Sequence, residues 1–166
     1  MAASMFGSLK DFIASFTSST RLQKFEGKEC QLPTAALLAR VATVEREMSD
    51  ARREKLCALM KTYFGLDDLA VAQLIRDATE AAASAVDLYH FTRQLSGALD
   101  DKGRQCTVKM MWQVVYADGR ANDFESNIIW RTADLLGVSS RQRIELRQLV
   151  AADATSRNPG AVLTAG

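Results

Sequence analysis

Apolar residues recur at every third or fourth position along most of this chain, and short polar stretches interrupt them at fairly regular intervals. This spacing predicts a series of amphipathic helices. Proline occurs only at positions 33 and 159, and Ala, Leu, Arg and Glu are frequent between them, which also favours helix. In the main body we expect seven helical segments, at residues 34–45, 50–64, 68–83, 86–99, 102–117, 123–136 and 140–153.

Residues suited to helix ends stand at the borders of these segments. Pro33 is expected in the first turn of the first segment, where a missing N–H costs least. The side chains expected to cap helix starts are those of Ser49, Asp67, Asn122 and Ser139. Gly65 and Gly137 stand where left-handed C-caps would lie. Because the connections are short, neighbouring helices should be antiparallel. The predicted fold is all-α, a compact bundle of about seven or eight helices.

Two stretches of the chain share one pattern: an apolar helix, an acidic turn, and a second helix that ends in glycine. They are Glu45–Gly65 and Asp118–Gly137, and the first is one residue longer. Aligning their first residues places Arg52 opposite Glu125. We interpret the bundle as two pseudo-repeated helix-turn-helix halves, although helix-turn-helix patterns also resemble one another by chance. Two copies are too few for a solenoid.

The N-terminal region, residues 1–32, is expected to form an amphipathic helix followed by a polar loop. Its apolar stripe consists of Phe6, Leu9, Ile13 and Phe16. Such a helix can fold onto the core, pair with a second subunit in a homodimer, or dock on a partner or the membrane surface through residues 5–16. Residues 33–153 form the expected helical domain, and the small, polar tail 154–166 is expected to be disordered.

Length and charge narrow the functional classes. The 166 residues suffice for one domain with its own core. The 21 basic and 20 acidic residues nearly cancel, so we expect no nucleic-acid partner. We find no secretory signal and no stretch near the roughly 18 apolar residues of a membrane span. These features predict a cytoplasmic protein, membrane-associated at most through its N-terminal helix.

The three cysteines, Cys30, Cys57 and Cys106, lie far apart in the sequence. An odd count cannot form a complete disulfide framework, so we expect buried, reduced thiols. Cys30 lies near an expected loop and should be the most accessible of the three.

The turn between residues 118 and 125 carries the strongest candidate chemistry. Carboxylate and amide oxygens in a tight turn can surround a hard cation such as Ca²⁺, Mg²⁺ or Mn²⁺. Gly119 would allow the positive φ of a sharp loop. The loop is not an EF-hand, because the glycine directly follows the aspartate. The candidate metal ligands are Asp118, Asn122, Asp123 and Glu125.

The same turn can be explained without an ion. Asn122 and Glu125 have the spacing of a capping box. Asp123 would suit the positive end of the helix dipole, and Asp118 could accept from loop amides.

The matching turn of the first half is poorer in acids. Glu45 and Glu47 are acidic, but Arg46 replaces the glycine and Arg52 replaces the second acid. An arginine beside Glu45 could fill a cation's place with a salt bridge, so no tight metal is expected there.

No catalytic motif is present. His90 is the only histidine and lies within an expected helix, where a structural role is more common. Zinc-ligand, phosphate-loop and nucleophile-elbow spacings are absent. We therefore predict that the protein is not an enzyme; a nucleophile activated by His90 is the remaining catalytic alternative.

Several short stretches resemble the TerB family of bacterial tellurite-resistance proteins. They are Leu37–Val41, Phe64–Leu66, Val86–Arg93, Trp112–Gly119, Glu125 and Leu135–Val138. The chain is most similar to the stand-alone bacterial branch, and it also resembles the N-terminal domain of DnaJ-like membrane co-chaperones. The J-domain's His-Pro-Asp is missing, so Hsp70 stimulation does not carry over.

The resemblance implies an all-helical fold whose acidic turns bind a divalent metal, and non-enzymatic roles in stress response, often in complexes near the membrane. Asp118, Gly119 and Glu125 match the family's acidic motif, whereas Arg46 and Arg52 depart from it. The expected function is a stress-response module that binds a divalent cation weakly and contacts an unidentified protein. The alternative is a metal-free scaffold, peripheral to the membrane.

Overall fold

The computed structural model describes residues 28–45, 47–85 and 87–157. Within these ranges no strand occurs, and the elements in chain order are α2 (Lys28–Ala42), α3 (Asp50–Phe64), α4 (Asp68–Ser84), α5 (Tyr89–Ala98), α6 (Asp101–Val115), the 3₁₀ turn η1 (Tyr116–Asp118), α7 (Asp123–Leu135) and α8 (Ser140–Arg157). The predicted all-α bundle is confirmed.

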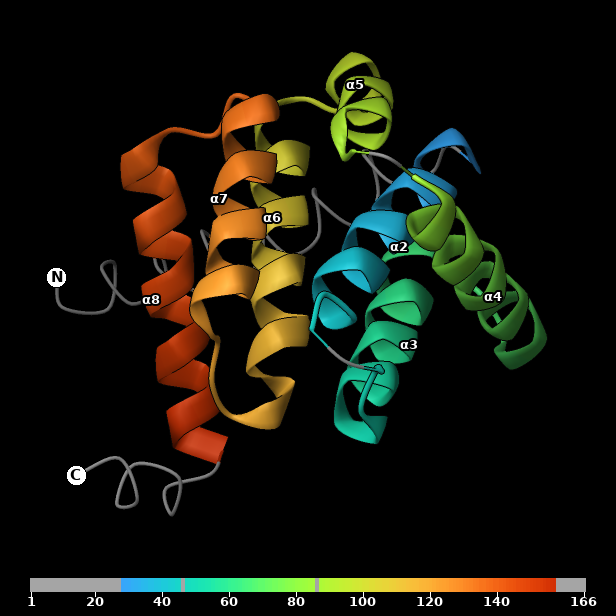
Figure 1. The fold of residues 1–166 in the computed structure, drawn as a ribbon, viewed down its shortest axis with the longest axis horizontal. Helices are drawn as coiled ribbons and strands as arrows, with labels where there is room; N and C mark the ends of the chain where they lie inside the picture. Colours follow the sequence, from blue (N-terminus) through green and yellow to red (C-terminus); the bar gives the residue numbers. More distant parts are fainter. Residues whose placement is uncertain (1–27, 46, 86, 158–166) are drawn as a thin grey trace, which may run out of the picture.

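The helices form two groups that meet along α2 and α6. Figure 1 shows α6, α7 and α8 side by side, α2, α3 and α4 on the other side, and α5 across one end. Helix α2 packs against α3, α4, α5, α6 and α7. Helix α6 packs against α2, α3, α7 and α8. Because α2 and α6 are central, the turns that follow them are brought together at the same end of the bundle.

The sequence of α2 explains its central position. The side chains of residues 35–39 and Val41 are all fully buried, so this helix is apolar on more than one side. The prediction that the helix starts at Pro33 is wrong, because α2 begins five residues earlier and Pro33 lies inside it. Proline removes one hydrogen bond to the preceding turn. Burial of Cys30 and Thr34 on either side of Pro33 favours continuation of the helix.

Two expected domain boundaries also differ from the observed helix ends. Residues 28–32, assigned to the N-terminal loop, belong to α2, and residues 154–157, assigned to the tail, continue α8. The partial burial of Ala151 and Ala154 keeps this end of α8 on the bundle. The expected helix at 5–16 and the tail beyond 157 lie outside the described residues.

The predicted caps are confirmed. Each of the four N-cap side chains accepts a backbone N–H three residues further on; these caps are Ser49, Asp67, Asn122 and Ser139. Gly65 and Gly137 end α3 and α7 with φ of 64° and 77°, conformations that cost other residues more.

The core is densest along α6. Met110, Met111, Trp112, Val114 and Val115 are at most 1% exposed, which confirms the prediction of a central helix. Helix α8 covers this core partly through arginines.

Two arginines of α8 lie over aromatic rings of neighbouring helices. The Arg143 guanidinium lies 3.7 Å from the centre of the Trp130 ring, and that of Arg147 lies 5.0 Å from the centre of Trp112. Such cation–π contacts each contribute on the order of 1 kcal/mol.

All three cysteines are free thiols. The prediction that Cys30 is the most accessible is wrong: it is 2% exposed because α2 already begins at Lys28, whereas Cys57 is half-buried. Burial, reinforced by the neighbouring Glu29 carboxylate, raises the pKa of the Cys30 thiol. Cys30 is therefore a core residue and a poor nucleophile.

Candidate functional site

The turn between α2 and α3 meets the turn between η1 and α7 at one end of the bundle. Hydrogen bonds and ion pairs join residues 45–52 to residues 118–125. Between the two turns lies an open hollow of about 690 Å³, lined by Glu45, Glu47, Ser49, Arg52, Asp118, Arg120, Ala121, Asn122, Asp123 and Glu125. The hollow is the candidate site, and each of its central side chains has a defined partner.

Arg52 occupies the centre of this arrangement. It lies in the first turn of α3 and is only 8% exposed. Its Nε lies 2.8 Å from Asp118 Oδ2; it makes no hydrogen bond in good geometry, so this contact is an ion pair. A terminal nitrogen pairs with Glu125 Oε2. One guanidinium therefore pairs with both carboxylates that the sequence identified as the principal metal ligands.

Two backbone carbonyls complete the surroundings of the guanidinium. The terminal nitrogens of Arg52 donate to Ala42 O at 3.3 Å and to Val115 O at 3.4 Å. Ala42 and Val115 are the last residues of α2 and α6. Carbonyls at a helix C-terminus lack intrahelical partners and carry partial negative charge. Arg52 thus lies among four oxygens, two from carboxylates and two from helix ends.

Glu125 is held from two sides. Its side chain is 2% exposed. Oε1 accepts the Asn122 N–H at 3.0 Å, and the Asn122 side chain accepts the Glu125 N–H at 2.8 Å, which forms the predicted capping box. Oε2 faces Arg52. The carboxylate is therefore buried with both oxygens paired, as a charged group in the interior requires.

Asp118 is held by the other half of the molecule. Ser49 Oγ donates to its carboxylate, with distances of 2.8 and 2.9 Å to the two oxygens. Ser49 Oγ also accepts the Arg52 N–H and so caps α3. Gly119, next to Asp118, has a φ of 100°, as the sequence predicted for a sharp loop.

The contacts between the two turns are reciprocal. Ser49 and Asn122 are equivalent N-caps, and Arg52 and Glu125 are the third residues of the helices that follow. The acid of each turn contacts the N-cap of the other: Asp118 accepts from Ser49, and Glu45 accepts from the Asn122 amide. The equivalent residues Arg52 and Glu125 pair with each other. The two halves therefore join through matching positions of the repeat.

The model of the family described as tellurite resistance protein TerB matches residues 31–148. The chain belongs to the TerB family. No curated protein and no solved structure gives a match. The TerB match includes all of α3 to α7 and both turns of the candidate site. The turn that holds Asp118 and Glu125 therefore lies within the family match.

In this TerB chain the four candidate metal ligands do not converge on one point. Asp118 and Glu125 face Arg52, and Asn122 is engaged with Glu45 and the start of α7. Asp123 is exposed. Among the described residues no group of three His, Cys, Asp or Glu side chains is arranged to hold a metal ion. As arranged, Asp118 and Glu125 are paired with a guanidinium; metal binding stays a prediction.

Two residues of the site were not identified from the sequence. Arg52 was expected only as a departure from the acidic pattern, and Ser49 only as a cap. The available signal was the alignment of the halves, which set a basic residue opposite Glu125. Arg46, the other arginine of that turn, lies outside the described residues.

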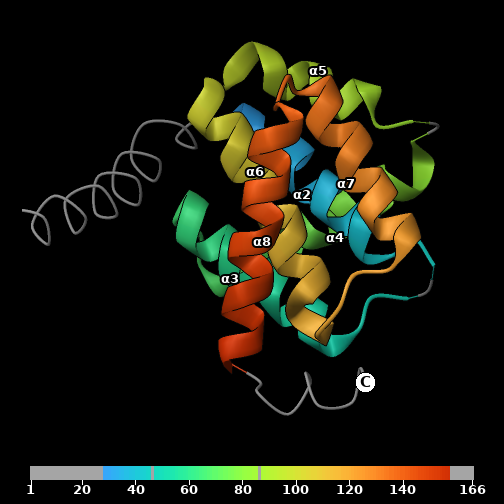
Figure 2. The same cartoon turned by 90° about the vertical axis from the view of Figure 1, so that its left-hand side faces the viewer.

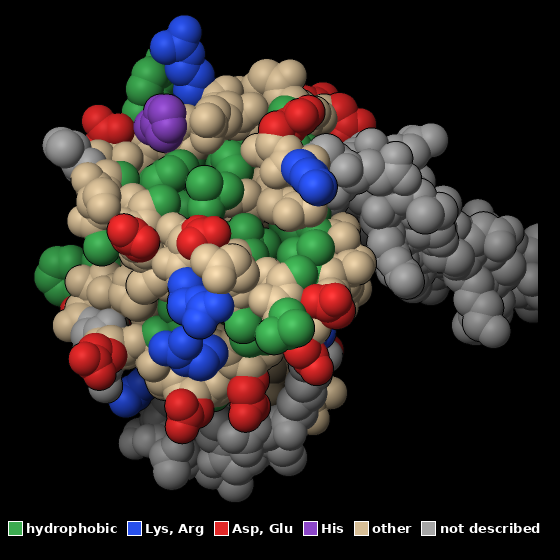
Figure 3. Space-filling view, turned by 90° about the vertical axis from the view of Figure 1, so that its right-hand side faces the viewer, with side chains coloured by type: hydrophobic (Ala, Val, Ile, Leu, Met, Phe, Trp, Pro, Cys, Tyr) green, Lys and Arg blue, Asp and Glu red, His purple; other side chains and the backbone are tan. Residues whose placement is uncertain are grey.

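His90 lies away from this site. It is exposed at the start of α5 and contacts the Phe91 ring edge-on, with centroids 5.7 Å apart. Figure 3 shows the face that carries this histidine, with apolar side chains gathered beside it. The hollow there is lined by Leu32, Ala81, Ser84, Ala85, Asp87, His90, Phe91 and Gln94. It contains none of the three cysteines, so no cysteine–histidine pair forms there.

Membrane-spanning helices do not occur among the described residues. None of the helices there is long and apolar enough to cross a bilayer.

The capping box supplies a first testable prediction. Replacing Asn122 with alanine should lower the free energy of unfolding by about 1–2 kcal/mol, because α7 loses its cap and Glu45 loses its partner. Urea unfolding followed by circular dichroism measures this change. Asn127→Ala is the matched control, since Asn127 is exposed within the same helix. Equal stability of the two variants would show that the box contributes nothing.

Proposed function

We propose that this TerB-family chain is a non-enzymatic stress-response module that acts by contacting another protein, and that Arg52 takes the place of a divalent ion in its acidic turn. The observation that carries the proposal is the Arg52 guanidinium between Asp118 and Glu125. The family name, tellurite resistance protein, supports the stress-response role.

Energetics favour the internal cation over an ion from solution. An ion at Asp118 and Glu125 has to displace the guanidinium of Arg52, a residue that is only 8% exposed. Displacement would leave the charge of Arg52 without its partners, and an unpaired buried charge typically costs about 3–5 kcal/mol. Millimolar Ca²⁺ or Mg²⁺ would therefore bind here weakly at best. The contacts between the two turns would then form without an ion.

The module would then act as a scaffold of fixed shape. The Arg52 contacts tie α3 to the ends of α2 and α6 and to the start of α7. Four elements from both halves thus depend on one side chain. Partner binding by such a scaffold should not respond to chelators.

A specific observation favours a second candidate function. This is weak cation binding by exposed acidic side chains at the rim, the solvent-facing edge of the hollow between the two turns. Glu47 and Asp123 are exposed there, and neither side chain has a hydrogen bond or ion pair in the described part of the chain. Together with Glu45 they could attract Ca²⁺, Mg²⁺ or Mn²⁺ without displacing Arg52. Binding of this kind would be loose, because solvent replaces most ligands.

An ion titration tests the proposal. We expect metal-stripped protein to show no saturable amide NMR shifts at Asp118, Gly119 and Glu125 with Ca²⁺, Mg²⁺, Mn²⁺ or Zn²⁺ up to millimolar concentration. Matched NaCl additions control for ionic strength, which acts on all exposed charges.

The two candidates give different results. Saturable shifts at Asp118 and Glu125 would contradict the proposal and establish the ion-binding function. Shifts confined to Glu47 and Asp123, unchanged in an Asp118→Asn variant, would indicate rim binding only.

A further inference from the structure

A groove runs along the side of the bundle between α3 and α8. Both helices pack on α6, and the last turn of α6 and η1 form the floor between them. Figure 2 shows this side of the molecule, with α8 in front and α6 and α3 behind it. The groove has a volume of about 540 Å³ and reaches Asp118 at the edge of the candidate site.

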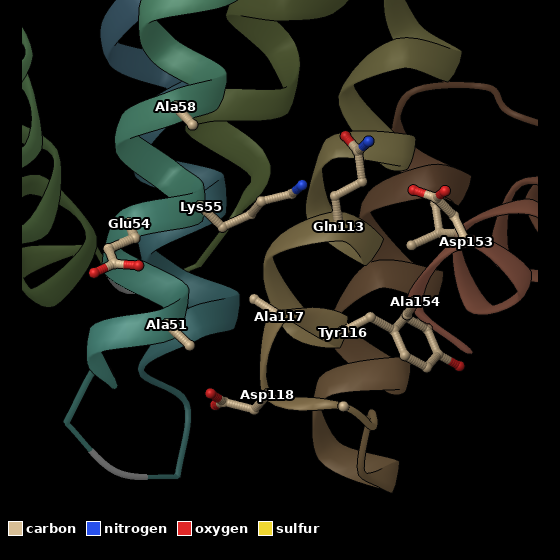
Figure 4. Close-up of a pocket in the computed structure, with 12 residues that line it drawn as sticks. Ala51, Glu54, Lys55, Ala58, Gln113, Tyr116, Ala117, Asp118, Asp153 and Ala154 are labelled. Atoms are coloured by element: carbon tan, nitrogen blue, oxygen red, sulfur yellow. The ribbon is translucent and has the colours of Figure 1, made fainter. Parts of the chain in front are cut away.

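Small apolar side chains line this groove. Ala51 and Ala58 lie two turns apart on α3, Ala117 lies on the floor, and Val150 and Ala154 lie on α8. Figure 4 shows Ala51 and Ala58 on α3, Gln113 on α6 across from them, and the Tyr116 ring pointing toward Ala154. Alanines lower the groove walls and let another backbone approach, which suits the large side chains of an amphipathic helix.

One polar group in the groove lacks a partner. The side-chain oxygen of Gln113 is shielded from solvent and makes no hydrogen bond in the described part of the chain. Such an acceptor costs stability unless a donor reaches it. The groove therefore offers an apolar surface next to an acceptor without a partner.

The chain itself carries a segment that fits. Residues 1–27 lie outside the described residues, and the stripe of Phe6, Leu9, Ile13 and Phe16 lies within them. A helix of about twelve residues is marginal in water unless its apolar face is covered. The eleven residues from 17 to 27 can span roughly 36 Å. Helix α2 has 15 residues, so Lys28 lies about 21 Å from Ala42, whose carbonyl accepts from Arg52 at the candidate site next to the groove. The tether is therefore long enough for the stripe to approach the groove from Lys28.

We propose that residues 5–16 dock as a helix in the groove between α3 and α8, with the apolar stripe against the alanines. The tether holds the segment at millimolar effective concentration, which favours this occupant over a second copy at lower concentration. The docked segment covers the surface beside Asp118. This inference does not depend on the proposed function, because neither an ion nor Arg52 enters it.

Hydrogen exchange of the full-length protein tests the docking. Amides of residues 5–16 should exchange at least about tenfold more slowly than in an isolated peptide of the same sequence, and NOEs should join the Ile13 methyls to those of Ala51 or Ala58. Ala58→Trp should fill the groove and abolish both signals. Ala72→Trp, at an exposed position of α4, should leave them unchanged.

A second pair of variants acts on the segment and leaves the bundle untouched. Leu9→Asp should abolish the protection, and Ser15→Asp, off the stripe, should preserve it. Peptide-like exchange in the unaltered protein would overturn the proposal, as would protection that survives Ala58→Trp. Protection that depends on protein concentration would assign the stripe to a second copy. Protection seen only with anionic vesicles would assign it to the membrane, and either outcome rejects the groove.

Discussion

Replacing Arg52 with leucine is expected to lower the free energy of unfolding by about 3–5 kcal/mol, the usual cost of removing one partner from a buried ion pair. The change leaves Glu125, which is 2% exposed, without its cation, and removes the donors to Ala42 O and Val115 O. Because those carbonyls end α2 and α6, the loss acts on both halves. Urea unfolding at neutral pH measures the effect.

Neighbouring variants separate this effect from general damage to α3. Arg53→Leu changes an exposed arginine of the same helix turn and should alter stability by no more than about 0.5 kcal/mol. Adding Glu125→Gln to Arg52→Leu should restore part of the loss, since the glutamine oxygen can still accept the Asn122 N–H without a buried charge. An Arg52→Leu protein as stable as the unaltered chain would show that the guanidinium does not join the halves.

Most of the fold could be predicted because its signals are local. Each helix from α3 to α8 except α5 begins at a side-chain cap that acts within a few residues, as at Ser49, and α3 and α7 also end at a glycine. The start of α2 could not be predicted the same way. Pro33 is a valid start signal, but burial of Cys30 and Thr34 outweighs one lost hydrogen bond. Local rules fail where tertiary packing opposes them.

The candidate site was predictable only in part. The spacing of Asn122 and Glu125 predicted the capping box, and the acids around Asp118 left open whether the turn holds a cation. The source of that cation could not be read from spacing, because Arg52 and Glu125 are 73 positions apart in the sequence. Their pairing depends on how α2 and α6 pack, which sets the two turns at one end of the bundle.

The reciprocal contacts explain why an arginine can occupy this place. If both halves carried an acid where Arg52 and Glu125 now stand, two buried carboxylates would face each other and would require an ion between them. A single basic residue at one of the two positions supplies that charge from within the chain. In the sequence, Arg52 interrupts the acidic pattern of the first half. In the structure, the same residue supplies the positive charge that balances Glu125.

Reversing that asymmetry should create an ion site. Arg52→Asp would leave three carboxylates, from positions 52, 118 and 125, beside the carbonyls of Ala42 and Val115. Ca²⁺ prefers oxygen ligands of this kind, carboxylate and carbonyl together. Without an ion the variant should be strongly destabilised by its unpaired acids. With Ca²⁺ at 100 times the dissociation constant, binding should return about 2.7 kcal/mol, which raises the melting temperature by roughly 5–10 °C for a chain of this size.

The expected rise in melting temperature with Ca²⁺ is specific to Arg52→Asp and depends on the carboxylate at position 52. Thermal unfolding of the unaltered protein should not change with millimolar CaCl₂ relative to NaCl of equal ionic strength, because Arg52 holds both carboxylates. Arg52→Asn removes the guanidinium without adding an acid and should respond less than Arg52→Asp. If Ca²⁺ and Mn²⁺ leave the melting temperature of Arg52→Asp unchanged, the oxygens around position 52 do not form a cation cage. If they raise it, one side chain decides whether this arrangement of helices carries its own cation or takes one from solution.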